Sequence, residues 1–457
     1  MATTSRSADL TSGPMLQKII LFSVPLAASS ILQLLFNAAD VVVVGRFAGS
    51  TALAAVGSNG SLINLLVNLF VGLSLGANVV AARCFGARDE KGVQDTVHTA
   101  VALGLVSGVL LAVVGFCAAR GLLELMSCPE DVIGLSALYL KIYFIGMPMT
   151  MLYNFSSALL RAVGDTKRPL YCLAAAGIIN VVLNLVFVIG FSMSVAGVAL
   201  ATIISQTVSA LLVTGMLVRE KGALRLDLRR LAFHAGTLKQ ILLIGLPAGL
   251  QSTVFSLSNV VIQSSINSFG STVMAGSAAA NNIENFVYQA MNAFYQTNLT
   301  FTGQNYGAGE CKRVDKSLFY CQGFVILTGL ILGNLAYFFG HPLVSIYNSD
   351  EAVIQQGIIR LGYIARTYAL CGIMDTMVGS LRGLGYSIVP MVVSLIGACG
   401  LRIVWIFTIF RVWHSLESLY ASYPITWGLA ALCDVLCFFL VFRHLRQKQR
   451  AQAQESA

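Results

Sequence analysis

The chain repeats itself once, about 221 residues along, and both copies lie among apolar segments long enough to cross a membrane. Prolines, glycines, an asparagine and an arginine recur at an offset of 221 or 222, and an apolar background alone would not repeat such residues. The aligned pairs are Pro25 with Pro247, Asn37 with Asn259, Arg161 with Arg382, Gly164 with Gly385, and Phe85-Gly86-Ala87 with Tyr306-Gly307-Ala308. Duplication in a chain with many membrane spans is typical of transporters, whose related halves can move about a central site.

The composition excludes an ordinary soluble protein. Hydrophobic residues make up 56% of the chain and charged residues only 11%, against about 25% charged in a typical soluble domain. The ten cysteines are scattered through apolar stretches, and the close pair Cys433 and Cys437 has helical spacing. Neither a disulfide framework nor a zinc site is therefore expected.

Twelve segments are long and apolar enough to be membrane-spanning helices, since about 20 residues cross the hydrocarbon core. The fold class predicted is an all-α integral membrane protein. The expected spans are 17–43, 52–80, 93–119, 131–158, 170–192, 195–217, 239–266, 272–300, 314–339, 351–380, 388–411 and 422–444.

The basic residues orient these spans. If the N-terminus is cytoplasmic, 22 of the 29 Lys and Arg fall in inner segments and three in outer loops, namely Arg46, Arg120 and Arg411. Positive charge concentrates on the cytoplasmic side of membrane proteins. The net charge of +9 therefore reflects topology, and no nucleic-acid partner is expected. We expect a multi-pass protein of the bacterial inner membrane with both termini in the cytoplasm.

The spans divide into two halves of six. The expected organisation is a cytoplasmic tail at 1–16, a lobe at 17–217, a charged cytoplasmic linker at 218–238, a second lobe at 239–444 and a cytoplasmic tail at 445–457. An even number of spans returns the chain to the same side, so both halves insert in the same orientation. The lobes are then parallel repeats, related by a pseudo-two-fold axis along the membrane normal.

Three groups of residues resemble one family of transporters. They are Pro25, Gln33 and Asp40 followed by Val44-Gly45-Arg46; the loop 83–87 with its mate 304–308; and the segment 160–165 with its mate 381–385. Together with six-plus-six spans, these features resemble the multidrug and toxic compound extrusion (MATE) family over residues 15–445. The resemblance is closer to the bacterial DinF-like branch than to the NorM-like branch. It implies an antiporter that exports cationic, amphipathic organic compounds in exchange for H⁺ or Na⁺.

Acidic residues within the expected spans are functional candidates, because a carboxylate at membrane depth is costly unless it is paired or hydrated. Those that lie away from the ends of the spans are Asp40, Glu284, Asp375 and Asp434. Asp40 is the strongest candidate for coupling. It shares a helical face with Gln33 and Asn37, on a helix that Pro25 interrupts and allows to bend. A carboxylate in an apolar cavity can bind and release a proton.

The resemblance implies that Asp40 works with polar residues of the fourth, fifth and sixth spans. These are Tyr139, Asn180, Asn184 and Thr202. Asn184 stands where archaeal members can have a carboxylate, and an amide cannot titrate. Asp40 is then the sole acid of this cavity, which favours protons over Na⁺, although Na⁺ at Asp40 stays an alternative. Tyr139 is equally compatible with simple packing between helices.

The C-terminal half offers weaker candidates for coupling than Asp40 in the N-terminal half. The NorM-like members have acids in the seventh and tenth spans, but the seventh span here offers only polar residues such as Gln251 and Asn259. Glu284 and Asp375 are candidates for coupling or for attracting cationic substrates. The alternative for each is an intramembrane ion pair with Arg360 or Arg366. Asp434 is expected to be structural.

Other function classes fit less well. A lipid-linked saccharide flippase of the same superfamily is the main alternative, but only four bases lie within the spans and away from their ends: Lys141, Arg360, Arg366 and Arg402. The histidines form no catalytic pattern and there is no phosphate-binding GxxxxGK[ST] loop, which argues against an enzyme and a nucleotide-driven pump. The repeat favours alternating access over a channel. We expect a monomer that needs no cofactor and acts on small drug-like molecules.

Overall fold

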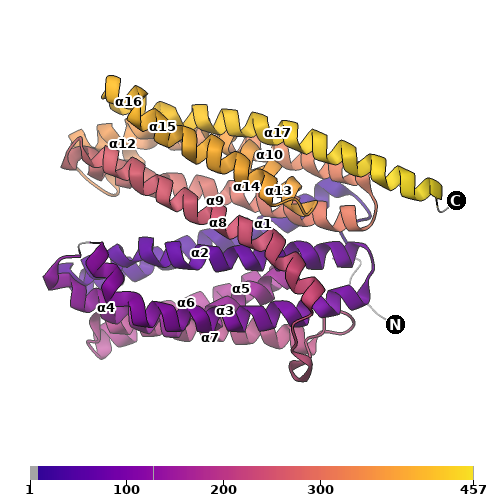
Figure 1. The fold of residues 1–457 in the computed structure, drawn as a ribbon. Helices are drawn as coiled ribbons and strands as arrows, with labels where there is room; N and C mark the ends of the chain where they lie inside the picture. Colours follow the sequence, from indigo (N-terminus) through magenta and orange to yellow (C-terminus); the bar gives the residue numbers. More distant parts are fainter. Residues whose placement is uncertain (1–8, 127, 456–457) are drawn as a thin grey trace. The chain divides into compact units, whose positions relative to one another are not determined.

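The computed structural model describes residues 9–126 and 128–455, and all regular structure in these ranges is helical (Figure 1). Residues 1–8 of the expected N-terminal tail and 456–457 of the C-terminal tail lie outside the described ranges. The first half contains α1 (Met15–Phe47), α2 (Ser50–Gly86), α3 (Glu90–Leu125), α4 (Glu130–Ile145), α5 (Met147–Ala162), α6 (Lys167–Leu185), the π-helix η1 (Val186–Gly190) and α7 (Ser194–Arg219).

The second half follows a short 3-10 turn, η2 (Leu228–Arg230). Its elements are α8 (Ala235–Asn267), α9 (Ser271–Gly307), α10 (Cys311–Phe338), α11 (Gly340–Ser345), α12 (Glu351–Tyr363), the 3-10 turn η3 (Ala365–Thr367), α13 (Tyr368–Gly383), α14 (Ile388–Ser394), the π-helix η4 (Leu395–Gly400), α15 (Leu401–Phe407), α16 (Ile409–Val412) and α17 (Leu416–Glu455).

Each of the twelve expected spans coincides with one helix or one interrupted helical segment. Within the described ranges, nine helices are long and apolar enough to cross a membrane, or ten if α4 and α5, which meet at 48°, form one bent span. The two expected spans that do not meet this criterion are α9 and the segment α12–η3–α13. They carry the polar and charged residues of the C-terminal half, including Glu284, Arg360 and Asp375, so their composition is less apolar than that of a lipid-facing helix.

The duplication is visible in the backbone. Helices α2 and α9 have 37 residues each and begin 221 positions apart. Three pairs of residues with positive φ recur at the same offset: Gly49 (89°) with Gly270 (95°), Arg88 (55°) with Gly309 (75°), and Gly164 (95°) with Gly385 (90°). Left-handed backbone is favourable for glycine and strained for other residues, so these turns are built alike in both halves.

The contacts divide the chain into two compact units whose boundaries differ from the expected lobes at two places. Unit 1 contains residues 28–249, and unit 2 contains residues 9–27 together with the chain from 250 onward. The first part of α1 thus packs in unit 2, and the first part of α8 packs in unit 1. In both helices the boundary follows a proline, Pro25 or Pro247, by two residues.

The packing explains both boundaries. In unit 2, Leu10, Ile19 and Phe22 are buried in one cluster with Phe301 and Cys321. In unit 1, glycines let the backbones of α2 and α8 touch: a Cβ at Gly72 would lie 2.3 Å from the backbone nitrogen of Gly249, and one at Gly76 would lie 2.4 Å from the carbonyl oxygen of Ile241. Small residues permit such close approach between membrane helices.

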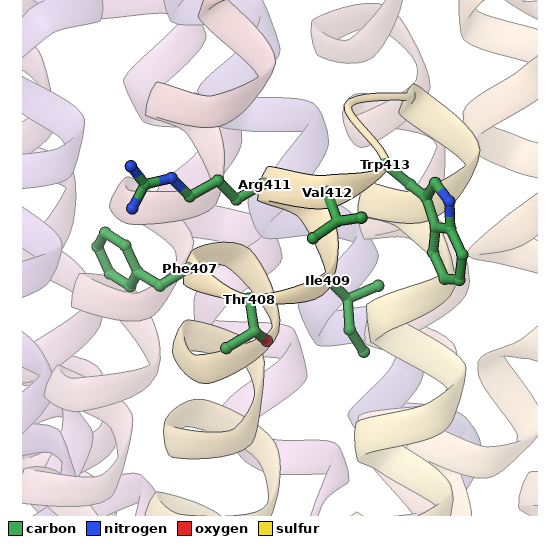
Figure 2. Close-up of a pocket in the computed structure, with 6 residues that line it drawn as sticks. All are labelled: Phe407, Thr408, Ile409, Arg411, Val412 and Trp413. Carbon is green, nitrogen blue, oxygen red and sulfur yellow. The ribbon is translucent and has the colours of Figure 1, made fainter.

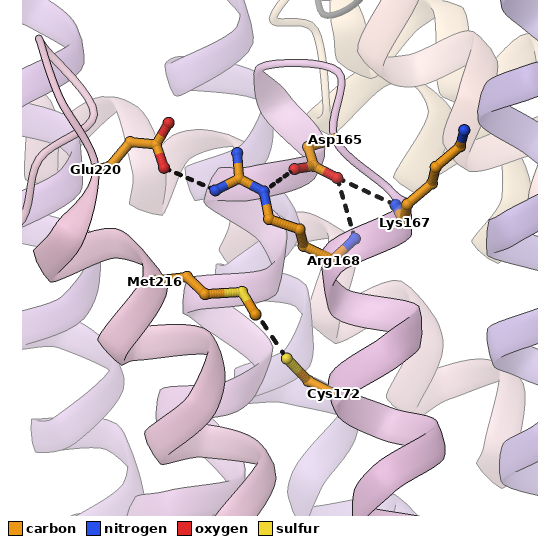
Figure 3. A network of polar contacts seen from close by, with 6 residues as sticks. All are labelled: Asp165, Lys167, Arg168, Cys172, Met216 and Glu220. Atoms are coloured by element: carbon orange, nitrogen blue, oxygen red, sulfur yellow. Dashed lines mark hydrogen bonds and ion pairs between the residues drawn. The ribbon is translucent and has the colours of Figure 1, made fainter. Parts of the chain in front are cut away.

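A polar network at the start of α6 ties this helix to the end of α7 (Figure 3). Arg168 is ion-paired with Asp165 and, at 2.7 Å, with Glu220. Asp165 also accepts hydrogen bonds of 3.1 Å from the backbone nitrogens of Lys167 and Arg168. The linker continues from here, and Asp227 donates its backbone N–H to Nε2 of His98 on α3 at 3.2 Å.

Candidate functional site

Asp40 lies in a polar cluster formed by α1, α6 and α7 of unit 1. Asn184 Nδ2 donates a hydrogen bond to Asp40 Oδ1 and a second one, of 3.2 Å, to Asn180 Oδ1. Thr202 is the other side chain that hydrogen-bonds Asp40. The structure therefore brings together the acid and the three polar partners expected for it on the fifth and sixth spans.

A close helix contact positions this cluster. Gly177 on α6 lies against the ring of Phe36 on α1, and a Cβ at Gly177 would come within 1.8 Å of that ring. Asn180 and Asn184 follow on α6 at a spacing of three and seven residues from Gly177, so they share a face with it. The glycine lets α6 approach α1 closely enough for Asn184 to reach Asp40. The π-helix η1 begins two residues after Asn184.

The remaining fourth-span candidate lies beside the cluster. Tyr139 on α4 is buried, and its ring stacks on that of Tyr143 at 6.0 Å between centroids. Both tyrosines interact electrostatically with Asp40. Their hydroxyls form no hydrogen bond with Asp40 in the structure. The position of Tyr139 thus agrees with an aromatic wall around the acid.

The cluster has no positive partner. None of the ion pairs formed by the described residues includes Asp40. Asn184 is fully buried, and its Oδ1 atom has no hydrogen-bond partner. A protonated Asp40 could donate to such an oxygen, whereas an ionised Asp40 can only accept from the amide nitrogen.

The other predicted residues of α1 take different positions. Gln33 and Asn37 are exposed, and neither forms a hydrogen bond with Asp40. Pro25 is buried within α1, close to the boundary between the two units. In the described part of the chain, no group of three or more His, Cys, Asp or Glu side chains could hold a metal ion.

Glu284 in unit 2 is neutralised by an arginine. It is 1% exposed, and Arg360 donates to it from Nε at 3.1 Å and from Nη2 at 2.9 Å. Arg360 also donates to Ser277 at 2.7 Å and to Asn281 at 3.1 Å. Of the two readings of Glu284 offered by the sequence, the intramembrane pair with Arg360 is the one that the structure contains. Ser277 and Asn281 were not predicted from the sequence, although their spacing with Glu284 on one helical face is a signal that could have pointed to this network.

Asp375 belongs to a second polar group of unit 2. Tyr288 hydrogen-bonds it and Arg382 is its charged neighbour. Arg382 donates to Gln251 Oε1 and to the Tyr295 hydroxyl, both at 2.6 Å. Gln251 therefore serves as an anchor for Arg382, a role that its sequence context did not indicate. Asn259 is exposed. Asp434 is fully buried and its carboxylate oxygens have no hydrogen-bond partner.

An open hollow of about 500 Å³ lies at one end of α15 and α16 (Figure 2). It is lined by Phe407, Thr408, Ile409, Arg411, Val412 and Trp413. Phe407, Val412 and Trp413 are exposed, and none of the predicted site residues lines the hollow. The hollow is thus formed where α15 ends and α16 follows it.

Comparison with known proteins shows the same duplication. The model of the MatE family matches residues 25–186 and again 247–408, so the two matches begin at the paired prolines. The "Probable multidrug resistance protein YpnP" of Bacillus subtilis is 30% identical over 97% of this chain and 98% of that protein. The "FAD transporter" of Shewanella oneidensis is 25% identical over 76% of this chain and 77% of that protein.

A solved structure has the same fold. It is described as the outward-facing conformation of a multidrug resistance MATE family transporter of the MOP superfamily. The TM-score is 0.90 at 22% identity, over 98% of this chain and 100% of the solved chain. The twelve-segment arrangement and its internal repeat are therefore those of this group of structures.

Proposed function

Because the chain belongs to the MatE family of membrane transporters, we propose that it is a secondary antiporter for drug-like organic compounds. The cargo is a cationic amphipathic molecule that leaves the cytoplasm, and the ion that enters in exchange is a proton. Similarity to a relative named as a multidrug resistance protein supports the cargo class. The chain is a transporter and not an enzyme.

One observation carries the choice of coupling ion. Asp40 has no cationic partner among the described residues, and its neighbours Asn180, Asn184 and Thr202 are neutral hydrogen-bonding groups. A lone carboxylate of this kind is discharged by one proton. A sodium ion would gain from further oxygen charge, which Asn184 does not supply. Sodium stays the alternative ion, bound at Asp40 with amide and hydroxyl oxygens.

The proposed cycle uses the difference in affinity between two states of the protein. Cargo binds from the cytoplasm while Asp40 is ionised. A proton then enters from outside and neutralises Asp40, α1 bends near Pro25, and the cargo site becomes less favourable. An ion can shift a conformational equilibrium only by as much as its affinity differs between the states. The half-buried, uncompensated carboxylate of Asp40 is the group for which that difference is expected to be large.

The test is dye efflux from proteoliposomes under an imposed proton gradient and, separately, a sodium gradient. We expect the proton gradient to drive efflux by the wild type and not by Asp40→Asn. The control is Asp131→Asn, an exposed residue in the first turn of α4, which should retain efflux. Undiminished proton-driven efflux by Asp40→Asn would contradict this assignment. Efflux that only the sodium gradient drives would replace the proton by Na⁺.

A second candidate cargo carries phosphate, as in a lipid-linked saccharide flippase or in the relative named as a FAD transporter. The observation that favours it is Arg402, a buried arginine that takes part in none of the ion pairs of the described residues. It ranks second because the other intramembrane bases are few, and Arg360 is already neutralised by Glu284.

We place the protein in the bacterial inner membrane as a monomer, with both termini in the cytoplasm and without a nucleic-acid partner. The long apolar helices support a multi-pass membrane protein. The distribution of Lys and Arg supports the orientation of the termini.

A further inference from the structure

We propose that unit 2 contains a buried binding site for the anionic group of an amphipathic molecule, centred on Arg402. The proposal rests on the transporter function and develops its second candidate cargo, the one that carries phosphate, rather than the cationic cargo. It does not need transport for its test.

The repeat shows where this site lies. At the offset of 222 residues that pairs Pro25 with Pro247, Asp40 corresponds to Ile262. At the offset of 221 that holds later in the repeat, Tyr139 corresponds to Arg360 and Thr202 to Tyr423. Asn180 corresponds to Leu401, so Arg402 stands next to the counterpart of Asn180. The acid of unit 1 is therefore replaced by an apolar residue in unit 2, and arginines stand at or beside two of the other positions. The equivalent places in the two halves carry charge of opposite sign.

Only one of these arginines is compensated. Arg360 is ion-paired with Glu284 at 2.9 Å. Arg402 is 2% exposed, and no ion pair in the described part of the chain includes it. Arg402 donates from Nη2 to Thr426 Oγ1 at 3.2 Å, and its Nε has no hydrogen-bond partner. A guanidinium has five N–H donors and keeps its charge in proteins, so most of its donors are unused here.

The two other intramembrane acids of the unit, Asp375 and Asp434, do not compensate Arg402. The charged neighbours of Asp434 are Asp375 and Arg382, and the charged neighbour of Asp375 is Arg382. Neither acid interacts with Arg402. A buried charge without a partner is unfavourable, and a buried polar group without a partner in a native protein calls for an explanation such as an ion or ligand.

Aromatic rings hold the guanidinium in place without using its N–H groups. Its carbon lies 4.1 Å from the centre of the Tyr423 ring and 5.8 Å from that of Trp427. A cation–π contact engages the face of the guanidinium, while its N–H groups lie in the plane and can donate two parallel hydrogen bonds to a carboxylate or phosphate. Apolar and aromatic walls around such a group suit the charged end of an amphipathic molecule.

The helix that carries Arg402 is interrupted on both sides of it. The π-helix η4 ends at Gly400, and α15 ends at Phe407 before the short helix α16. Insertions of this type are frequent at functional sites, and interrupted membrane helices often form the substrate sites of transporters. This second observation is independent of the charge of Arg402.

The experiment uses iodide, an anion that quenches tryptophan fluorescence on contact. The chain has three tryptophans, so the purified full-length variant Trp405→Phe/Trp413→Phe reports on Trp427 alone. We expect saturable quenching by iodide. We also expect dodecyl phosphate to relieve it, whereas neutral dodecyl maltoside does not. In the Arg402→Gln variant, binding of dodecyl phosphate should weaken by roughly 30-fold or more, the ratio expected when a buried charge pair loses one member.

Two further variants serve as controls, one for the charge and geometry of Arg402 and one for the loss of an unrelated arginine. Arg402→Lys retains the charge without the planar fork; it should keep iodide quenching and lose most of the affinity for dodecyl phosphate, and it replaces Arg402→Gln if that variant does not fold. Arg366→Gln removes an exposed arginine that lies over the Tyr337 ring at 4.9 Å, and it should behave as the parent does.

Three results would overturn the proposal. Equal quenching in the parent and in Arg402→Gln would mean that Arg402 binds no anion. Relief by inorganic phosphate as effective as relief by dodecyl phosphate would assign the site to a free anion. Quenching that neither phosphate compound relieves would leave an adventitious ion only. The quenching experiment measures binding and not transport. Absence of dye efflux in proteoliposomes would therefore contradict the proposed antiporter without deciding whether Arg402 binds an anion.

Discussion

The acidic side chains within the helices differ in whether they have a cationic partner. Asp40 is left without a cation and is surrounded by neutral donors, while Glu284 is held by two nitrogens of Arg360. We expect the first arrangement to allow the Asp40 carboxyl group to bind and release a proton without breaking an ion pair. The second fixes both charges, because separating them would leave each one buried and unpaired. We therefore expect the acidic side chain to serve proton exchange in unit 1 and structure in unit 2.

The structural role of Glu284 leads to a prediction about stability. Glu284→Gln should lower the free energy of unfolding by about 3–5 kcal/mol, because it leaves the Arg360 guanidinium buried without its counter-charge. The double variant Glu284→Gln/Arg360→Met should recover much of this loss. Thermal unfolding of the detergent-purified variants measures both effects. A single variant as stable as the wild type, with proton-driven efflux abolished, would instead make Glu284 a coupling residue.

Helices in this protein are positioned as much by glycine as by large apolar residues. Gly177 brings α6 against Phe36 of α1, and Gly72 and Gly76 bring α2 against the backbone of α8. The sequence makes the helices themselves predictable, since long apolar stretches bounded by turns leave few alternatives. The partners of each glycine were not predictable, because contact between distant helices depends on their relative rotation.

The contact at Gly177 can be tested by adding one methyl group. Gly177→Ala should push α6 away from α1, lower stability by about 1–3 kcal/mol as overpacked cores do, and reduce proton-driven efflux by separating Asn184 from Asp40. The second change Phe36→Ala should restore much of both properties. Gly215→Ala on α7 is the control, since a Cβ there has no neighbour within 4 Å. Equal behaviour of Gly177→Ala and Gly215→Ala would show that this contact does not position the cluster.

The duplication, the helical class and the Asp40 cluster follow from spacing and from resemblance. Two features of the complete chain could not be predicted from spacing or from resemblance. The units divide α1 and α8 at Pro25 and Pro247, whereas charge patterning places the natural division in the linker 218–238. Pairing of Arg382 with Gln251 joins residues 131 positions apart, and no local pattern in the sequence specifies such a contact.

The orientation in the membrane is a prediction for the chain as a whole. In a cysteine-free background, Lys221→Cys in the linker should react with a membrane-impermeant maleimide only after the cells are permeabilised. Glu130→Cys at the start of α4 should react in intact cells. Both positions are exposed. Labelling of Lys221→Cys in intact cells would reverse the topology, and the proton would then have to enter from the opposite side.

The division of α1 and α8 between the units bears on how such a chain could have arisen by gene duplication. A half-length chain would lack the helix segment that completes its own core: the buried cluster around Phe301 needs Leu10, Ile19 and Phe22, and the glycine face of α2 needs the start of α8. Two identical half-chains would have supplied these segments to each other, which is domain swapping. In an ancestral homodimer, the two half-chains would have had to exchange these helix segments each time the dimer assembled. Gene fusion would have joined both copies in one chain, so that the exchange became intramolecular.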